Sequence, residues 1–207
     1  MLDPGDLFVF IAALVAVYLL PGPDMALVLS ASVFQGRRNG LMVAAGLALS
    51  RALHVSLAGI GLAALLKAHP ILFDAVRWIG AIYLIWMAWK ILRANKTNAG
   101  SDPLEGAAGW QALQRGFLTN LLNPKALMFC ALLLPQFISP SGNLFEQYLI
   151  LGLVLVALGV VFDVIYVYAA TDLASRFSGS RYGKQIAHYL FASVFALAAV
   201  RLVISPR

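Results

Sequence analysis

Apolar residues occur along the chain in six long stretches that are separated by short polar segments. The stretches cover residues 7–33, 41–66, 71–92, 113–138, 146–170 and 187–204. Each is close to or above the roughly 20 residues that an α-helix needs to cross the hydrocarbon core of a bilayer. The pattern therefore predicts an all-α integral membrane protein, a single transmembrane domain over residues 1–207 with six transmembrane helices.

Composition supports a membrane protein over a water-soluble one. Hydrophobic residues make up 61% of the 207 residues and charged residues only 12%, against roughly half and a quarter in ordinary soluble domains. Asp3 and Asp6 precede the first apolar stretch, and no Lys or Arg does. Because cleaved signal peptides begin with a basic segment, we expect the first stretch to remain as a helix.

One long polar gap divides the chain into two groups of three stretches. Residues 93–109 are rich in Gly, Asn, Asp and Pro, which is typical of a linker. We assign residues 1–92 to repeat one and residues 110–207 to repeat two. Because three is an odd number, repeat two enters the membrane in the opposite sense to repeat one, as in the inverted repeats of many secondary transporters.

The basic residues predict the orientation of the helices. Nine lie on the side of the odd-numbered loops: Arg37, Arg38, Lys90, Arg93, Lys96, Arg115, Arg176, Arg181 and Lys184. Four lie on the opposite side: Lys67, Arg77, Arg201 and Arg207. Because cytoplasmic loops carry the excess of Lys and Arg, we expect a cytoplasmic linker and both termini outside. The net charge of +6 then reflects topology, and we expect no nucleic-acid partner.

Proline interrupts the first and the fourth apolar stretch at similar places. The interruptions are Pro21, Gly22, Pro23 and Asp24 in the first, and Asn123, Pro124 and Lys125 in the fourth. Proline has no amide hydrogen, so we expect the carbonyls of Val17, Leu19 and Asn120 to lose their helical donors, and we expect Gly22 to permit a sharp turn. The sequence therefore predicts that helices 1 and 4 are broken at prolines.

Two matched breaks, each followed by a charged residue, indicate a site for substrate binding or gating. Broken helices occur at membrane depth only where they line protein or a watery cavity. An ammonium group fits Asp24 or freed carbonyls, and a carboxylate fits Lys125 or free amides, so the pair suits a zwitterion. Asn120 and Asn123 can bind either substrate or the freed backbone. Alternatively, Asp24 caps its helix and Lys125 pairs with it as a structural bridge.

Three further polar residues lie deep in apolar stretches, where they are candidates for proton coupling or ion pairing. Arg51 lies about 16 Å along its helix at roughly 1.5 Å per residue, near the middle of the bilayer. His54 shares its face and is either a proton carrier or a packed, hydrogen-bonded imidazole. Asp163 is a candidate counter-ion for Arg51 or Lys125, or a proton carrier.

The sequence gives no indication of a metal or cofactor. Its three histidines, His54, His69 and His188, are scattered, and Cys130 is its single cysteine, so we expect no metal site and no dithiol. Neither the GxSxG nor the HExxH motif occurs, and we do not expect an enzyme. A membrane-embedded enzyme and a non-transporting membrane assembly protein remain as alternative functions.

Over essentially its full length, the chain resembles the LysE/RhtB family of bacterial amino-acid exporters. The resemblance rests on the early PGPD motif at 21–24, the NPK motif at 123–125 within TNLLNPKALMF, the glycine-spaced second stretch and the PQF triplet at 135–137. It implies a multi-pass protein of the bacterial inner membrane that exports amino acids or close derivatives and is driven by the proton gradient. The termini would then be periplasmic. A homodimer is possible.

Overall fold

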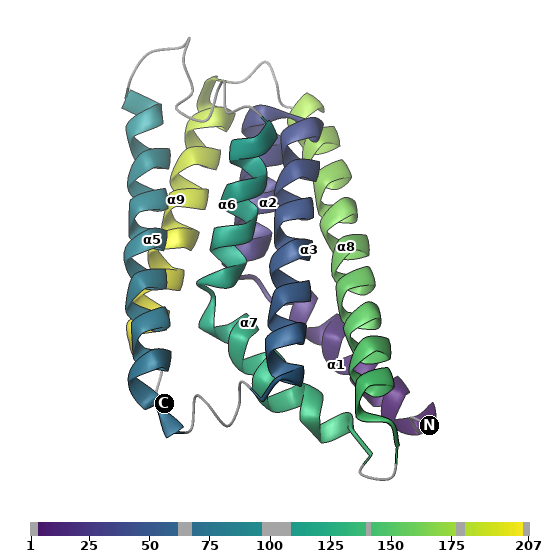
Figure 1. Cartoon of the computed structure of the whole chain (residues 1–207). Coiled ribbons are helices and arrows are strands. Elements are labelled where there is room, and N and C mark those ends of the chain that lie inside the picture. The colour runs from purple at the N-terminus through teal and green to yellow at the C-terminus, as the bar shows by residue number, and fades with distance from the viewer. Residues whose placement is uncertain (1–3, 62–67, 97–108, 140–141, 177–180, 205–207) are drawn as a thin grey trace.

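The computed structural model describes residues 4–61, 68–96, 109–139, 142–176 and 181–204. Within these ranges the chain is helical and contains no strand, which confirms the prediction of an all-α protein. Figure 1 shows the helices packed side by side in one elongated bundle.

The helices begin a few residues before most of the predicted apolar stretches, and α3 ends at Gly59, before the predicted residue 66. Their bounds are α1 Pro4–Leu19, α2 Pro23–Gln35, α3 Arg37–Gly59, α5 Pro70–Lys96, α6 Gly109–Leu121, α7 Pro124–Met128, α8 Leu144–Arg176 and α9 Arg181–Ile204. A π-helix, η1 (Phe129–Leu133), and a 3-10 helix, η2 (Leu134–Phe137), continue directly from α7. The predicted linker at 93–109 overlaps the last turn of α5, and its residues 97–108 lie outside the described ranges.

Several of these helices are long and apolar enough to cross a membrane. Three qualify alone: α3, the segment Asp74–Arg93 of α5 and the segment Leu144–Ser175 of α8. Two bent pairs bring the number to five, and α9 adds a shorter apolar segment, Gln185–Arg201. The chain is therefore a multi-pass membrane protein.

The bent pairs coincide with the two proline motifs. α1 and α2 meet at 55°, and α6 and the helix that begins at Pro124 meet at 58°. Pro23 and Pro124 each occupy the first turn of the helix after the break, where a missing amide hydrogen costs nothing. Gly22 has φ −160° and open space around an added Cβ, so its conformation does not require glycine, contrary to the expectation.

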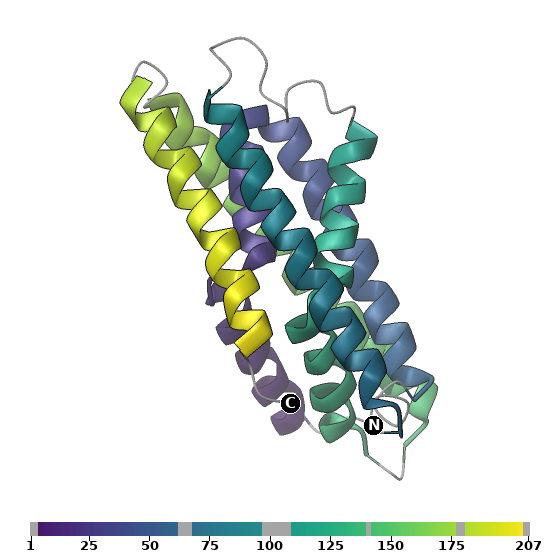
Figure 2. The same cartoon turned by 90° about the vertical axis from the view of Figure 1, so that its left-hand side faces the viewer.

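The helices run back and forth between two ends of the bundle. The start of α1 and the end of α9 lie at the same end in both views (Figures 1 and 2). At the opposite end α2 turns directly into α3 at Gly36, whose φ of 84° favours glycine. The end of α5, the start of α6 and the end of α8 also lie there.

Close backbone contact between α3 and α6 holds the centre of the bundle together. A Cβ added to Gly46 would collide with the backbone of Leu113 and Phe117, and one added to Gly116 would collide with the backbone of Val43. Glycine on both helices is what lets them approach this closely. α5 and α9 pack against each other as a second pair (Figure 2).

Candidate functional site

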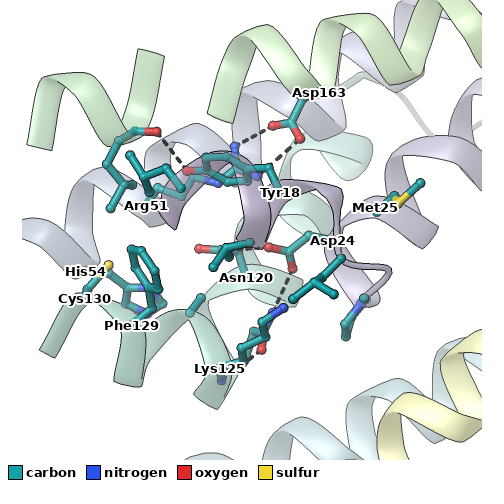
Figure 3. Close-up of a pocket in the computed structure, with 18 of the residues that line it drawn as sticks. Tyr18, Asp24, Met25, Arg51, His54, Asn120, Lys125, Phe129, Cys130 and Asp163 are labelled. Carbon is teal, nitrogen blue, oxygen red and sulfur yellow. Dashed lines mark hydrogen bonds and ion pairs between the residues drawn. The ribbon is translucent and has the colours of Figure 1, made fainter. Parts of the chain in front are cut away.

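A cavity of about 80 Å³ lies where the two broken helices meet. One water molecule needs roughly 10–15 Å³ on this measure, so the space holds a small solute or several waters. Its polar lining residues are Tyr18, Asp24, Arg51, His54, Asn120, Asn123, Lys125, Asp163 and Tyr166. Gly22 and Pro23 line it as well, so the structure brings most of the predicted site residues to one place (Figure 3).

Asp24 connects the two breaks through neutral hydrogen-bond donors. Nδ2 of Asn120 donates to Oδ2 of Asp24 at 2.6 Å, and Nδ2 of Asn123 donates to Oδ1 at 3.2 Å. Asp24 belongs to the first turn of α2, and the asparagines lie on either side of the second break. The two asparagines therefore bind the Asp24 carboxylate, rather than only the backbone of their own break.

Lys125 lies in the first turn of α7 on the same cavity wall. Its backbone amide donates to Oδ1 of Asn123 at 3.1 Å, so Asn123 caps α7. The side chain of Lys125 is exposed, and within the described residues no ion pair joins it to Asp24. In this conformation the cavity thus presents an anion and a cation that do not neutralise each other by contact.

Arg51 and Asp163 form a buried ion pair between α3 and α8. Nη1 of Arg51 lies 2.5 Å from Oδ2 of Asp163, and Nη2 lies 3.3 Å from Oδ1. Their side chains are only 5% and 4% exposed. Of the two predicted counter-ions of Asp163, the structure pairs it with Arg51, and the bidentate geometry leaves the pair electrically balanced.

Tyrosines bind the backbone next to the first break. The hydroxyl of Tyr166 donates to the carbonyl of Tyr18 at 2.7 Å, and the hydroxyl of Tyr18 donates to the carbonyl of Leu155 at 2.8 Å. The ring of Tyr18 also lies 5.2 Å from the Arg51 guanidinium. These contacts attach the end of α1 to α8. Sequence reasoning missed Tyr18; its only signal was a hydroxyl three residues before Pro21 in an aliphatic helix.

Two of the three carbonyls expected to be free are occupied. The amide of Leu20 donates to Val17 at 3.3 Å, and the amide of Asn123 donates to Asn120 at 3.0 Å. The chain tightens into a 3-10 turn just before each break, which satisfies carbonyls that an ideal α-helix would leave open. The carbonyls of Val17 and Asn120 therefore lose their α-helical donors, as expected, but they are not left free.

His54 is fully buried in the wall of the cavity. The backbone of Leu121 is a hydrogen-bond partner of the ring, with a geometry poorer than that of an ordinary hydrogen bond. His54 is thus a buried imidazole beside the backbone of Leu121, and its role as a proton carrier stays a prediction.

The rest of the lining is apolar. It consists of Leu14, Val17, Leu20, Met25, Ala126, Phe129, Cys130 and Leu155. The sequence did not identify these residues as cavity lining. Aliphatic side chains occur on every face of a membrane helix, so the residue type does not show whether a side chain faces lipid, core or cavity. Among the described residues no group of three potential metal ligands occurs.

Comparison with known proteins places the chain in a family. The profile described as LysE type translocator matches residues 15–206. A homoserine/homoserine lactone efflux protein of Salmonella typhimurium is 31% identical over 94% of both chains. A leucine efflux protein of Klebsiella pneumoniae is 34% identical over 65% of this chain and 64% of its own. No solved structure matches the chain.

Proposed function

Because the chain belongs to the LysE type translocator family, we propose that it is a secondary transporter that exports amino acids or close derivatives across the bacterial inner membrane. The observation that carries the proposal is the cavity at the two helix breaks, where Asp24 and Lys125 present opposite charges without pairing. The efflux proteins among its relatives support the direction and the substrate class.

The cavity suits a zwitterion. In the proposed complex the substrate ammonium lies against the Asp24 carboxylate, and the substrate carboxylate lies against the Lys125 ammonium. Arg51 and Asp163 already satisfy each other, so they add no net charge. A solute with one positive and one negative group therefore matches the two charges that are left.

Transport proceeds by alternating access between inverted repeats. We assign residues 1–92 and 110–207 to the two repeats, residues 93–109 to a cytoplasmic linker, and six spans to α1 with α2, α3, α5, α6 with α7, α8 and α9. The similar bends of 55° and 58° at the two breaks support this assignment. Discontinuous helices that meet near the middle of the membrane are the usual place for substrate in such transporters.

Export is tested with purified protein in vesicles loaded with radiolabelled amino acids. We expect Asp24→Asn and Lys125→Met to reduce efflux at least tenfold at equal protein abundance, because each removes one charge partner. Asp172→Asn and Lys90→Met are matched controls outside the cavity, and we expect them to transport normally. Unchanged efflux in both cavity variants would show that Asp24 and Lys125 are not needed for transport.

Asp24 is the better proton carrier of the two carboxylates that line the cavity. Its hydrogen bonds come from neutral amides, so it can gain a proton without breaking an ion pair, whereas Asp163 would have to leave Arg51. We expect an imposed proton gradient to accelerate efflux by the wild type but not residual efflux by Asp24→Asn. Acceleration of that residual efflux would exclude Asp24 as the carrier.

The same vesicle assay distinguishes transport from the two alternative functions. A membrane-embedded enzyme would convert its substrate without any gradient, and a non-transporting assembly protein would move no solute. Product analysis of the released radiolabel separates chemical conversion from transport.

A further inference from the structure

The half-helix α1 forms one wall of the cavity. Its lining residues are Leu14, Val17, Tyr18 and Leu20. α1 packs against α8 and against η2, which ends the segment after the second break. Figure 1 shows α1 in the half of the bundle that lies away from the turn between α2 and α3. α1 therefore separates the cavity from the end of the bundle at which α1 starts.

The apolar packing of α1 covers only one of its faces. Phe10 and Leu14 are 0% and 1% exposed and belong to an apolar cluster with residues of α3, α8 and η2. Phe8 and Val9 are 73% and 56% exposed, and the 55° bend separates α1 from α2. Apolar attraction is non-directional, so this packing alone allows α1 more than one position against α8.

Two tyrosine hydroxyls give α1 one definite position. The hydroxyl of Tyr166 on α8 donates to the carbonyl of Tyr18, and the hydroxyl of Tyr18 donates to the carbonyl of Leu155 on α8. The two bonds thus run between the helices in opposite directions. Hydrogen bonds depend steeply on distance and angle, so both are lost when α1 moves away from α8.

The break makes the carbonyl of Tyr18 dependent on Tyr166. In a continuous helix this carbonyl would accept from the amide of Gly22, but α1 ends at Leu19. Tyr166 supplies the donor that the helix has lost. A backbone carbonyl that leaves this donor needs water in its place, so separation of α1 from α8 is linked to the entry of water into the cavity.

The opposite wall of the cavity is held differently. There α3 and α6 are in backbone contact at Gly46 and Gly116, where an added Cβ would collide with main-chain atoms. Such close contact has no space for small displacements. In this conformation the wall formed by α1, which is tied to α8 by two hydroxyls, is the one that moves at the lower cost.

We propose that α1 is the gate between the cavity and the end of the bundle at which α1 starts, and that Tyr18 and Tyr166 are positioning residues that hold this gate closed. The inference rests on the proposed function, because it assigns a gate to the cavity of the transporter. When both hydrogen bonds break, α1 tilts away from α8 and the cavity becomes accessible to water and solute from that end.

Cys130 reports the state of this gate. It is the single cysteine of the chain, it is 3% exposed, and it lines the cavity. A membrane-impermeant methanethiosulfonate reagent therefore reaches its thiol only when the cavity opens, and mass spectrometry measures the rate of labelling. Spheroplasts offer the periplasmic face to the reagent, and inverted membrane vesicles offer the cytoplasmic face.

We expect Tyr166→Phe to raise the labelling rate about 3- to 10-fold, as the loss of one hydrogen bond of ordinary net strength predicts. The increase should occur only from the face at which α1 starts. Tyr18→Phe should act in the same direction but more weakly, because Leu155 lies inside α8, whose own amides also bind its carbonyl. Tyr168→Phe is the matched control, since Tyr168 lies on α8 outside the cavity and its hydroxyl makes no hydrogen bond with a described residue.

Unchanged labelling in both tyrosine variants would overturn the inference. Equal acceleration from both faces would overturn it as well, because general loosening of the bundle admits the reagent from either side. Labelling of Cys130 does not depend on transport, so these results leave the proposed function standing. The absence of amino-acid efflux would refute the proposed function and leave the labelling result intact. If Tyr166→Phe does not accumulate in the membrane, Tyr18→Phe decides the question.

Discussion

The ion pair between Arg51 and Asp163 places two charges deep inside the helix bundle. Both side chains are almost fully buried, and the pair joins α3 to α8 next to the Tyr18 ring. Such a pair adds little net stability, because desolvation offsets most of the attraction. Removing one partner is costly, because the other charge is then buried alone.

We therefore expect Arg51→Met to lower the free energy of unfolding by about 3–5 kcal/mol. The double variant Arg51→Met with Asp163→Leu should recover most of that loss, since it buries no charge. Thermal unfolding in detergent measures both. Arg37→Met is the comparison, because its pair with Asp172 is 50% and 66% exposed and such pairs contribute about 0–1 kcal/mol. A double variant as unstable as the single one would show that the pair does more than balance charge.

Charged residues at membrane depth could be identified from the sequence because burying a charge is costly and therefore rare. Asp24, Arg51, Lys125 and Asp163 all line the cavity for this reason. Which charges pair could not be predicted, because helix position does not fix which side chains meet. The sequence suggested a bridge between Asp24 and Lys125, whereas the structure satisfies Asp24 with two asparagines.

Helices α3 and α6 are in contact through their backbones, and this contact fixes the position of the second break relative to the centre of the bundle. Because a Cβ on Gly46 would collide with backbone atoms, the two helices would have to separate. We expect Gly46→Ala to lower the free energy of unfolding by about 1–3 kcal/mol, as overpacking does.

Gly59→Ala on the same helix is the matched control. Its Cβ would lie 3.6 Å from the ring of Tyr148, an ordinary contact, and Gly59 is the last residue of α3, so alanine there should change the free energy of unfolding little. Only Gly46→Ala should therefore destabilise the protein when unfolding is followed by the loss of helical circular dichroism. Equal effects would mean that α3 and α6 adapt to the added carbon.

At the scale of elements, the sequence predicted where helices break but not how they continue. Proline lacks the backbone amide hydrogen wherever it stands in a helix, so both breaks could be predicted from the sequence. The change from α-helix to π-helix at Phe129 and to 3-10 helix at Leu134 has no such marker. The segment after the second break packs against α3 and α1, and contacts between elements far apart in the chain are not visible in a local sequence pattern.

The whole molecule has two distinct ends, and the basic residues distinguish them. Arg37 and Arg38 lie at the turn between α2 and α3, and Arg93 lies near the end of α5, at the same end of the bundle (Figure 1). The start of α1 and the end of α9 lie at the other end. If the end with more Lys and Arg faces the cytoplasm, both termini are periplasmic.

Fusions to alkaline phosphatase test this orientation, because the enzyme folds only where disulfides form. We expect high phosphatase activity when it follows residue 207 and low activity when it replaces the chain after residue 100. Green fluorescent protein at the same two positions should give the opposite pattern. Phosphatase activity only in the fusion at residue 100 would mean that the orientation in the membrane is the opposite of the one predicted. The start of α1 and the end of α9 would then lie in the cytoplasm. The cavity would still lie at the helix breaks, but the two ends of the transport path would exchange roles.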